Sequence, residues 1–230
     1  MDIYGFTKTT LLDYPGHVAC TIFTGGCNFR CPFCHNYDLV IHPDIYPKVE
    51  KADIFSHLEK RKHVLSGICI SGGEPTLWPD ILEFLAKLKA TGKPVKLDTN
   101  GYRPDVLENA IKESLVDYVA MDIKAGRANY DKACGAHIDI SKIEKSVDIL
   151  AGSGIPYEFR TTCVKGIHTE EDFIDIARWL PSDAAYYLQS FKENDTVPDK
   201  SISSFSKEEL TSFVNILIPS ITNVTIRGVD

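Results

Sequence analysis

Three cysteines lie close together near the start of the 230-residue chain, at Cys27, Cys31 and Cys34. Their spacing is C-x3-C-x2-C, and they follow a short β-branched run at 18–24. Three thiolates on one tight loop can hold three corners of a 4Fe–4S cluster, because cysteine is the usual ligand of iron–sulfur centres. The fourth iron would keep an open position, which is also what distinguishes catalytic zinc sites from structural ones. The spacing therefore predicts a cluster whose open position binds a bidentate amino acid.

A structural zinc site is the alternative interpretation of the same cysteines. Zinc in such sites takes four ligands, and His35 is the nearby candidate for the fourth. His35 adjoins Cys34, however, and the side chains of adjacent residues rarely point at one metal ion. The remaining cysteines are scattered and form no second cluster motif: Cys20, Cys69, Cys134 and Cys163. The pattern therefore favours the cluster.

Short apolar runs alternate with longer amphipathic stretches along almost the whole chain. The expected strands are 18–24, 67–71, 95–99, 116–123, 157–164 and 184–191, with a short last one at 224–226. The expected helices are 52–64, 81–90, 104–114, 141–151, 170–180 and 206–217. This alternation is typical of parallel strands covered by helices on the outside. About six units fall short of the eight of a TIM barrel, so we predict an α/β fold, an open partial parallel β/α barrel, in a single domain over residues 1–230.

The composition limits the partners and the location. A net charge of −7 argues against a sequence-independent nucleic-acid binder, which normally has a basic face. No apolar run approaches the roughly 18–20 residues of a membrane span, and residues 1–5 lack the basic region and apolar core of a secretory signal. The odd number of seven cysteines, with three clustered, favours metal ligands over a disulfide framework. We therefore expect a cytoplasmic protein with no nucleic-acid or membrane partner.

Polar residues and glycines follow the expected strands in succession, and in a parallel barrel functional residues gather at the carboxyl ends of strands. Residues 71–75 (SGGEP) follow the second strand, 98–101 (DTNG) the third and 121–124 (MDIK) the fourth. Arg160 lies in the fifth strand and Gln189 in the sixth. Chance can explain a polar signature at each strand end alone, but not at all five. We therefore expect these residues to face the cysteine loop.

The charged residues among them suggest the binding of a charged ligand. The Glu74 carboxylate, next to two glycines that allow close approach of the backbone, can accept hydrogen bonds from an ammonium. Asp122 and Lys124 share one face of a strand, and burying both is costly unless they pair or bind a charge. Arg160 is suited to carboxylate recognition, although a structural ion pair with Glu158 is an equal alternative for this residue alone.

The cysteine loop resembles the signature of the radical S-adenosylmethionine (SAM) superfamily, including the aromatic Phe33 directly before the third cysteine. The lead-in at 12–16 (LDYPG) and the continuation at 34–36 (CHN) resemble one branch, the glycyl-radical-enzyme activases. Within that branch the chain looks most like the activating proteins of anaerobic ribonucleoside-triphosphate reductase. The resemblance covers most of the chain, from Gly5 to Phe191.

The resemblance implies two cofactors, a 4Fe–4S cluster and SAM, and it assigns roles to individual residues. Phe33 would pack near the adenine of SAM, Arg160 would hold its carboxylate, and Lys124 would act near SAM or the approaching substrate loop. The residues that would bind the remainder of SAM are Gly72, Gly73 and Glu74 at the amino group, with His35, Asn100, Asp122 and Gln189 nearby. Some activases also bind a monovalent cation, and the matching positions are Asp98, Thr99 and Asp122 with the Ala120 carbonyl.

The resemblance also implies the reaction and its partners. Nothing between Asn36 and Gly67 resembles the extra cysteine clusters of some activases, so an external flavodoxin- or ferredoxin-type donor would reduce the cluster. One electron would cleave SAM to methionine and a 5′-deoxyadenosyl radical, which takes hydrogen from a glycine Cα of a large partner enzyme. The partial barrel would leave an opening for that glycine loop. Exposed thiolates imply an anaerobic setting.

Three substrates are compatible with these residues. The first is an anaerobic ribonucleotide reductase, and the second is another glycyl radical enzyme such as a pyruvate formate-lyase. The third is a small molecule, as for a deazaguanine synthase. The stretches at 98–101 and 121–124 favour the first two, while the segment 126–138 would equally close over a substrate, meet a partner or form a solvated loop.

Overall fold

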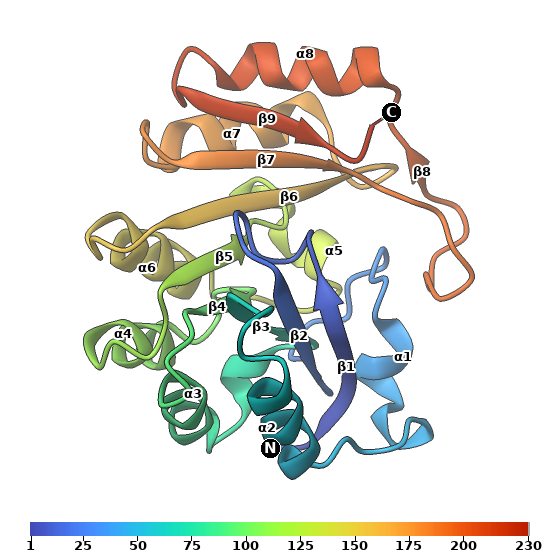
Figure 1. Ribbon diagram of the computed structural model, residues 1–230. Helices are drawn as coiled ribbons and strands as arrows, with labels where there is room; N and C mark the ends of the chain where they lie inside the picture. The colour runs from blue at the N-terminus through green and yellow to red at the C-terminus, as the bar shows by residue number, and fades with distance from the viewer. Residues whose placement is uncertain (230) are drawn as a thin grey trace.

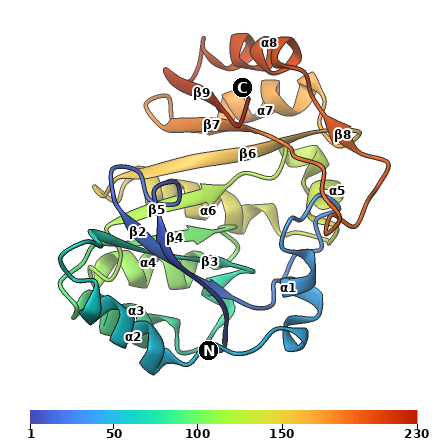
Figure 2. The ribbon, with the colours of Figure 1, turned by 45° about the vertical axis from the view of Figure 1, so that its right-hand side comes forward.

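One sheet of nine strands organises the chain, and Figures 1 and 2 show it curving like part of a barrel wall. The structure is a computed structural model that describes residues 1–229. The strands are β1 (Ile3–Thr10), β2 (Ala19–Thr24), β3 (Gly67–Gly72), β4 (Val95–Thr99), β5 (Tyr118–Asp122), β6 (Tyr157–Lys165), β7 (Ala185–Ser190), β8 (Ser203–Ser204) and β9 (Asn223–Arg227). Their order is β1-β2-β3-β4-β5-β6-β7-β9, and β8 pairs with β6 outside this path.

The direction of the strands places their ends together. Strands β2 to β7 and β9 run parallel, while β1 is antiparallel to β2. The edge strands β1 and β9 are at opposite ends of the order, so the sheet forms an open barrel and not a closed one. The carboxyl ends of the parallel strands therefore meet at one edge of the sheet.

The longer helices lie along the outside of this sheet, as Figure 2 shows. The helices are α1 (Tyr37–Ile41), α2 (Lys51–Lys60), α3 (Ile81–Lys89), α4 (Pro104–Lys112), α5 (Tyr130–Cys134), α6 (Ile140–Ala151), α7 (Glu170–Trp179) and α8 (Lys207–Leu217). Each long helix buries an apolar stripe, for example Phe84, Leu85 and Leu88 on α3. The core therefore lies between the outer face of the sheet and these helices.

The sequence-based prediction of the fold is confirmed in its main elements. The six expected strands, the short last strand and the six expected helices all occur, with ends shifted by a few residues. Strands β1 and β8 and helices α1 and α5 were not expected. Helix α5 falls inside the segment 126–138, which is therefore not an entirely irregular loop.

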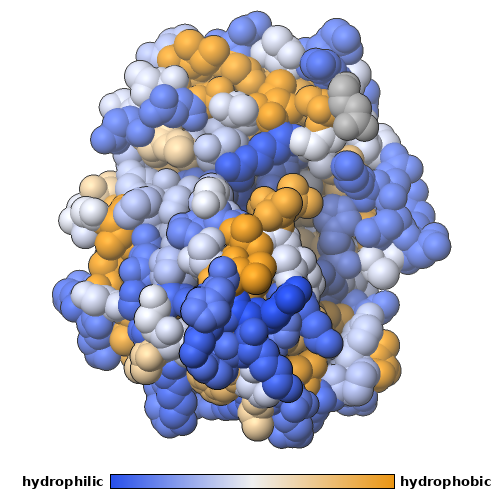
Figure 3. Space-filling model, viewed as in Figure 1, coloured by the Kyte–Doolittle hydropathy of each residue, from blue (hydrophilic) through white to orange (hydrophobic). Residues whose placement is uncertain are grey.

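The tip of the β1–β2 hairpin exposes two apolar side chains. At the tip of the β1–β2 hairpin, Leu11 and Leu12 are 72% and 90% exposed, and Figure 3 shows an apolar patch over that hairpin. Among the residues that the structure describes, no helix has the length and apolar character needed to cross a membrane.

Candidate active site

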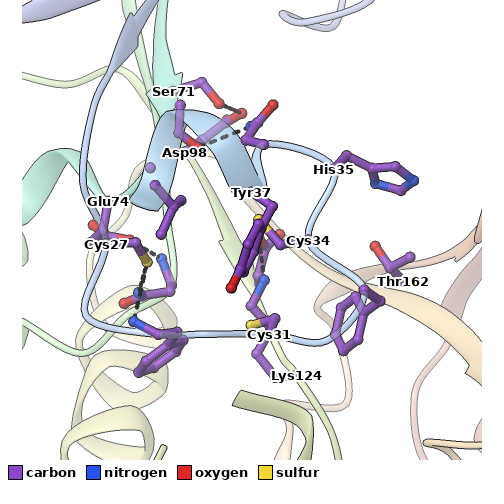
Figure 4. Close-up of a pocket in the computed structure, with 18 of the residues that line it drawn as sticks. Cys27, Cys31, Cys34, His35, Tyr37, Ser71, Glu74, Asp98, Lys124 and Thr162 are labelled. Atoms are coloured by element: carbon purple, nitrogen blue, oxygen red, sulfur yellow. Dashed lines mark hydrogen bonds and ion pairs between the residues drawn. The ribbon is translucent and has the colours of Figure 1, made fainter. Parts of the chain in front are cut away.

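A cavity of about 240 Å³ lies where the cysteine loop faces the carboxyl ends of the parallel strands (Figure 4). One side consists of residues from the loop 27–36, and the other consists of residues from the ends of β3 to β7. All the residues expected to hold the cluster or to contact SAM line this cavity: Cys27, Cys31, Phe33, Cys34, His35, Gly72, Gly73, Glu74, Asn100, Asp122, Lys124, Arg160 and Gln189. The fold thus brings these residues together, while their individual roles stay predictions.

The glycines after β3 hold the cysteine loop in place. The Gly73 N–H donates to the Thr24 carbonyl and the Glu74 N–H to the Gly26 carbonyl, both at 2.8 Å. A Cβ on Gly73 would lie 1.8 Å from the Gly26 oxygen, and Gly72 has φ +114°, a conformation that L side chains rarely adopt. The close approach that these glycines permit is therefore between two backbone segments of the chain itself.

The three sulfur atoms of the loop face the cavity from different directions. Cys27 Sγ accepts a hydrogen bond from the Phe29 N–H at 3.3 Å and contacts the Asn100 side chain at 3.7 Å. Within residues 1–229, no three His, Cys, Asp or Glu side chains lie close enough together to share a single metal ion. A zinc ion would need its sulfurs about 3.8 Å apart, given Zn–S bonds of about 2.3 Å, whereas a cubane gives each thiolate its own iron. Three cysteine thiols that line one cavity are a donor set that fits a 4Fe–4S cluster.

His35, the candidate for a fourth zinc ligand, points away from the cysteines (Figure 4). His35 Nε2 is 2.8 Å from the Lys192 carbonyl oxygen, and its ring packs on Phe191 with centroids 5.4 Å apart. Figure 4 shows His35 directed away from the cysteines. The zinc alternative therefore has no support from the position of His35.

The environments of the three thiols differ. Burial raises the pKa of Cys27 to about 12 and also raises the pKa of Cys34. A hydrogen bond with Cys134, followed by the charge of Lys124, lowers the pKa of Cys31 to about 7 against the opposing effect of burial. Metal ligation requires thiolates, so a metal centre held by these cysteines would have to stabilise the charged forms of the buried Cys27 and Cys34.

Glu74 lies in a corner of neutral hydrogen-bond donors. Its carboxylate accepts bonds from the Thr99 hydroxyl at 2.8 Å, the Asn100 N–H at 2.6 Å and the Thr76 N–H at 3.1 Å. The side chain is 1% exposed, and burial raises its pKa despite these bonds. Glu74 therefore links the turn after β3 to the end of β4.

The ends of β4, β5 and β6 carry a chain of alternating charges. Arg160 donates from Nε to Asp122 Oδ1 at 3.0 Å, and its Nη1 lies 3.5 Å from Asp98 Oδ2. Lys124 Nζ lies 3.0 Å from Asp122 Oδ2, and Lys96 Nζ donates to Asp98 Oδ1. Although burial opposes it, the charges of Lys124 and Arg160 lower the pKa of Asp122 to about 2. Both aspartates are therefore carboxylates with cationic partners.

These contacts correct one expectation and bear on a second one, which stays untested. The ion pair of Arg160 with Glu158 is wrong, because Glu158 accepts from Arg227 at 3.0 Å and from the Tyr118 hydroxyl at 2.9 Å instead. The expected monovalent cation site also fits poorly. Asp98 and Asp122 already carry cationic partners of this chain, and the Thr99 hydroxyl donates to Glu74.

Several residues of the site were not singled out by sequence reasoning. Ser71, which lies in the expected stretch 71–75 but had no role of its own, donates from its hydroxyl to Asp98 Oδ2 at 3.0 Å, and Thr162 lines the cavity two residues after Arg160. Lys96 and Asp98 share a face of β4 in the way that Asp122 and Lys124 share a face of the chain at the end of β5. The two-residue periodicity was the signal that could have found Lys96 and Thr162. Cys134 had no such signal, because α5 brings it to Cys31 from far along the chain.

Two proteins of known family are similar to this chain along most of its length. A protein of Methanocaldococcus jannaschii named "Putative glycyl-radical enzyme activating enzyme MJ1227" is 34% identical over 235 residues, which cover 99% of this chain and 96% of that protein. The pyruvate formate-lyase-activating enzyme of Streptococcus mutans is 28% identical over 210 residues, which cover 86% of this chain and 77% of that enzyme.

A solved structure and a family description complete the comparison. The crystal structure of Streptococcus suis SuiB bound to S-adenosylmethionine matches with a TM-score of 0.69 at 15% identity, over 89% of this chain and 49% of SuiB. The chain thus spans about half the length of SuiB, and this likeness concerns the fold alone. The model of the "Radical SAM superfamily" matches residues 21–180, which include the cysteine loop and the ends of β2 to β6. The chain therefore belongs to the radical SAM superfamily, whose members use a 4Fe–4S cluster and SAM.

Proposed function

We propose that this protein is an activase that generates a glycyl radical on a large partner enzyme, an anaerobic ribonucleoside-triphosphate reductase. The observation that carries the proposal is the cavity in which the three cysteines face five strand ends. Similarity to an activating enzyme over nearly the whole of both chains supports the choice of an activase. The residues at 12–16 and 34–36 favour the activase branch as a whole, and within it the resemblance to the activating proteins of anaerobic ribonucleoside-triphosphate reductase favours the reductase as the partner.

In this proposal the two sides of the cavity have separate tasks. Cys27, Cys31 and Cys34 hold the 4Fe–4S cluster, which, when reduced, supplies the electron that cleaves SAM to methionine and a 5′-deoxyadenosyl radical. Arg160 binds the SAM carboxylate, because the charged strand ends around it have a surplus of positive charge. Lys124, 6.0 Å from the centre of the Phe33 ring, keeps that surplus next to the adenine position.

The hydrogen and electron balance needs two further participants. A flavodoxin- or ferredoxin-type protein supplies one electron per SAM from outside. The glycine Cα–H of the partner gives its hydrogen atom to the 5′-deoxyadenosyl carbon, which leaves the radical on the glycine and releases 5′-deoxyadenosine. Glycine suits this step because it has no side chain to obstruct a narrow site. We place the reaction in the cytoplasm, where thiols stay reduced.

A pyruvate formate-lyase is the second candidate for the partner. It is favoured by one specific observation, the 28% identity with the Streptococcus mutans activating enzyme over 86% of this chain. The same cavity and the same hydrogen transfer would serve either partner, so the two candidates differ only in the surface that docks and in the glycine loop.

Electron paramagnetic resonance tests the proposal. The reconstituted protein is mixed anaerobically with SAM, a reductant and either the candidate reductase or a pyruvate formate-lyase from the same source. We expect a glycine-centred doublet with the reductase, and no doublet when the Cys31→Ala variant replaces the wild type. A doublet only with the lyase would move the assignment to the second candidate. SAM cleavage by an intact cluster enzyme without a doublet in either mixture would contradict the activase proposal.

A further inference from the structure

Lys96 is a buried lysine next to the cavity, and the proposed reaction gives it no role. It lies on β4, two residues before Asp98 and on the same face of the strand. The residue is 1% exposed, its Nζ donates to Asp98 Oδ1, and the Cys69 sulfur is 3.9 Å away. A buried ammonium is costly unless it is paired. The chain therefore keeps a fixed positive charge directly beneath the strand ends.

This charge belongs to a cluster that has more cations than carboxylates. Two carboxylates, Asp98 and Asp122, contact three cationic groups, Lys96, Arg160 and Lys124. The formal charge of the cluster is thus +1 when all five groups are ionised. Arg160 Nη2 lies 2.9 Å from Asp122 Oδ1 and Nη1 lies 3.5 Å from Asp98 Oδ2, so the guanidinium bridges the two aspartates.

We infer that Lys96 acts as a built-in replacement for a free monovalent cation at this site. Its ammonium neutralises Asp98, and Asp98 in turn orients Arg160 towards the carboxylate of SAM. Lys96 is in this sense a positioning residue, since it acts on SAM through Asp98 and Arg160. The inference rests on the proposed binding of SAM in this cavity.

Two physical arguments favour the tethered ammonium over Na⁺ or K⁺. A free cation between Asp98 and Asp122 would have to displace Arg160 or lie beside the fixed like charges of Lys96 and Lys124, which repel it in a site of low dielectric. A tethered group also needs no cation from solution, because its effective concentration at the site is set by the fold. SAM binding should therefore be independent of the identity of the monovalent salt.

Calorimetric titration of SAM into the anaerobically reconstituted wild type tests this independence. The titration is carried out in KCl, NaCl and choline chloride at equal ionic strength, because choline is too large for a site between two carboxylates. We expect the dissociation constants to agree within about twofold, since the three salts screen charges equally. SAM binding that requires K⁺ or Na⁺ would overturn the inference and leave the proposed function intact. An intact cluster that binds no SAM in any salt would contradict the proposed function itself.

Substitution of Lys96 provides the positive test. In Lys96→Met, we expect SAM affinity in choline chloride to fall by about tenfold or more, as for the loss of a charge-assisted interaction, and to recover in KCl. Lys96→Arg keeps the charge and should show no salt preference. Lys87→Met, which removes an exposed lysine paired with Glu83, is the matched control and should behave as the wild type. A Lys96→Met variant with wild-type affinity in choline chloride would assign Lys96 a purely structural part.

A measurement without SAM guards against a folding defect. The thermal unfolding midpoint of the apo-protein is compared in KCl and choline chloride for the wild type, Lys96→Met and the double variant Lys96→Met/Asp98→Asn. We expect KCl to raise the midpoint of Lys96→Met alone, because only that variant keeps the Asp98 carboxylate but removes the ammonium that donates to it. An equal midpoint in both salts for all three proteins would contradict the replacement of a cation by Lys96.

Discussion

The two walls of the same cavity are held together by different kinds of interaction. The cysteine wall, formed by residues 25–36 with Gly72–Glu74, is held mainly by hydrogen bonds to the backbone and by backbone packing, as between Gly73 and Gly26. The charged wall, at the ends of β4 to β6, is held by ion pairs such as Asp122 with Arg160. The difference is visible in two carboxyl groups, since the pKa of Glu74 is raised and that of Asp122 is lowered to about 2.

The two walls therefore control different properties of the site. A wall made of backbone contacts fixes the shape in which thiolates meet a metal cluster, and its failure should appear as loss of the cluster or of stability. A wall made of ion pairs with surplus positive charge fixes an electrostatic field, and its failure should appear as weaker binding of an anionic group. Substitutions on the two walls should therefore have different signatures.

The largest expected effect is on the cysteine wall. In Cys31→Ala, the cluster should lose one of its three ligands, so we expect the visible absorption of the cluster and the cleavage of SAM both to disappear. Iron analysis after anaerobic reconstitution and chromatographic detection of 5′-deoxyadenosine measure the two losses. Cys20→Ala, at a buried thiol within β2, is the matched control and should affect stability at most. Full activity of Cys31→Ala would abolish the distinction between the walls.

A smaller effect is expected where the cysteine wall meets β3. In Gly73→Ala the new Cβ would lie 1.8 Å from the Gly26 oxygen, so the loop has to move. We expect the apo-protein to lose about 1–3 kcal/mol of unfolding free energy, as in overpacked cores, and iron content after reconstitution to fall. Urea denaturation measures the first change. Gly152→Ala is the control, because its Cβ would make only an ordinary contact of 3.5 Å with the Asp148 carbonyl oxygen. Equal unfolding free energies of the two variants would show that the cysteine loop can move without loss of stability.

The third effect belongs to the charged wall and concerns the binding of SAM, with the fold and the cluster unchanged. In Arg160→Ala, one charge-assisted interaction with SAM is lost, which typically costs about 1.5–3 kcal/mol or roughly tenfold to more than a hundredfold in affinity. We expect this weakening by calorimetry while the iron content stays normal. Arg127→Ala, which removes an arginine paired with Asp175 on the surface, should leave SAM affinity unchanged. An unchanged affinity in Arg160→Ala would make the bridge between Asp98 and Asp122 its whole role.

The sequence predicted the central strands of the fold better than its edges. Central strands such as β3 are continuous buried apolar runs, which stand out against amphipathic helices. The edge strand β1 is mostly half-buried or exposed and has irregular pairing with β2, so its pattern lacks a clear period. The short helix α5 has too few residues to display a helical period.

In the site, the motifs identified which residues meet but not how they bond. The positions of Gly72 and Gly73 at a strand end could be read from the sequence, whereas their contact with Thr24 and Gly26 depends on the parallel pairing of β2 and β3. The local sequence also does not indicate which residues on neighbouring strands form hydrogen bonds with each other. Nothing in the local sequence indicates that Arg160 bonds to Asp122 and not to its neighbour Glu158, because that choice depends on the register of β5 and β6.

The contact of Gly73 with Gly26 also bears on how the cysteine loop is built when the chain folds. The cysteine loop is held in its shape by the docking of β3 beside β2. The carbonyl oxygens of Thr24 and Gly26 accept from the N–H groups of Gly73 and Glu74, which follow helices α1 and α2 in the sequence. Closing that long crossover is a slow, entropically costly step of folding. We therefore expect the protein to fold without iron and to accept a cluster afterwards, so that cluster-free protein can be loaded without renewed synthesis.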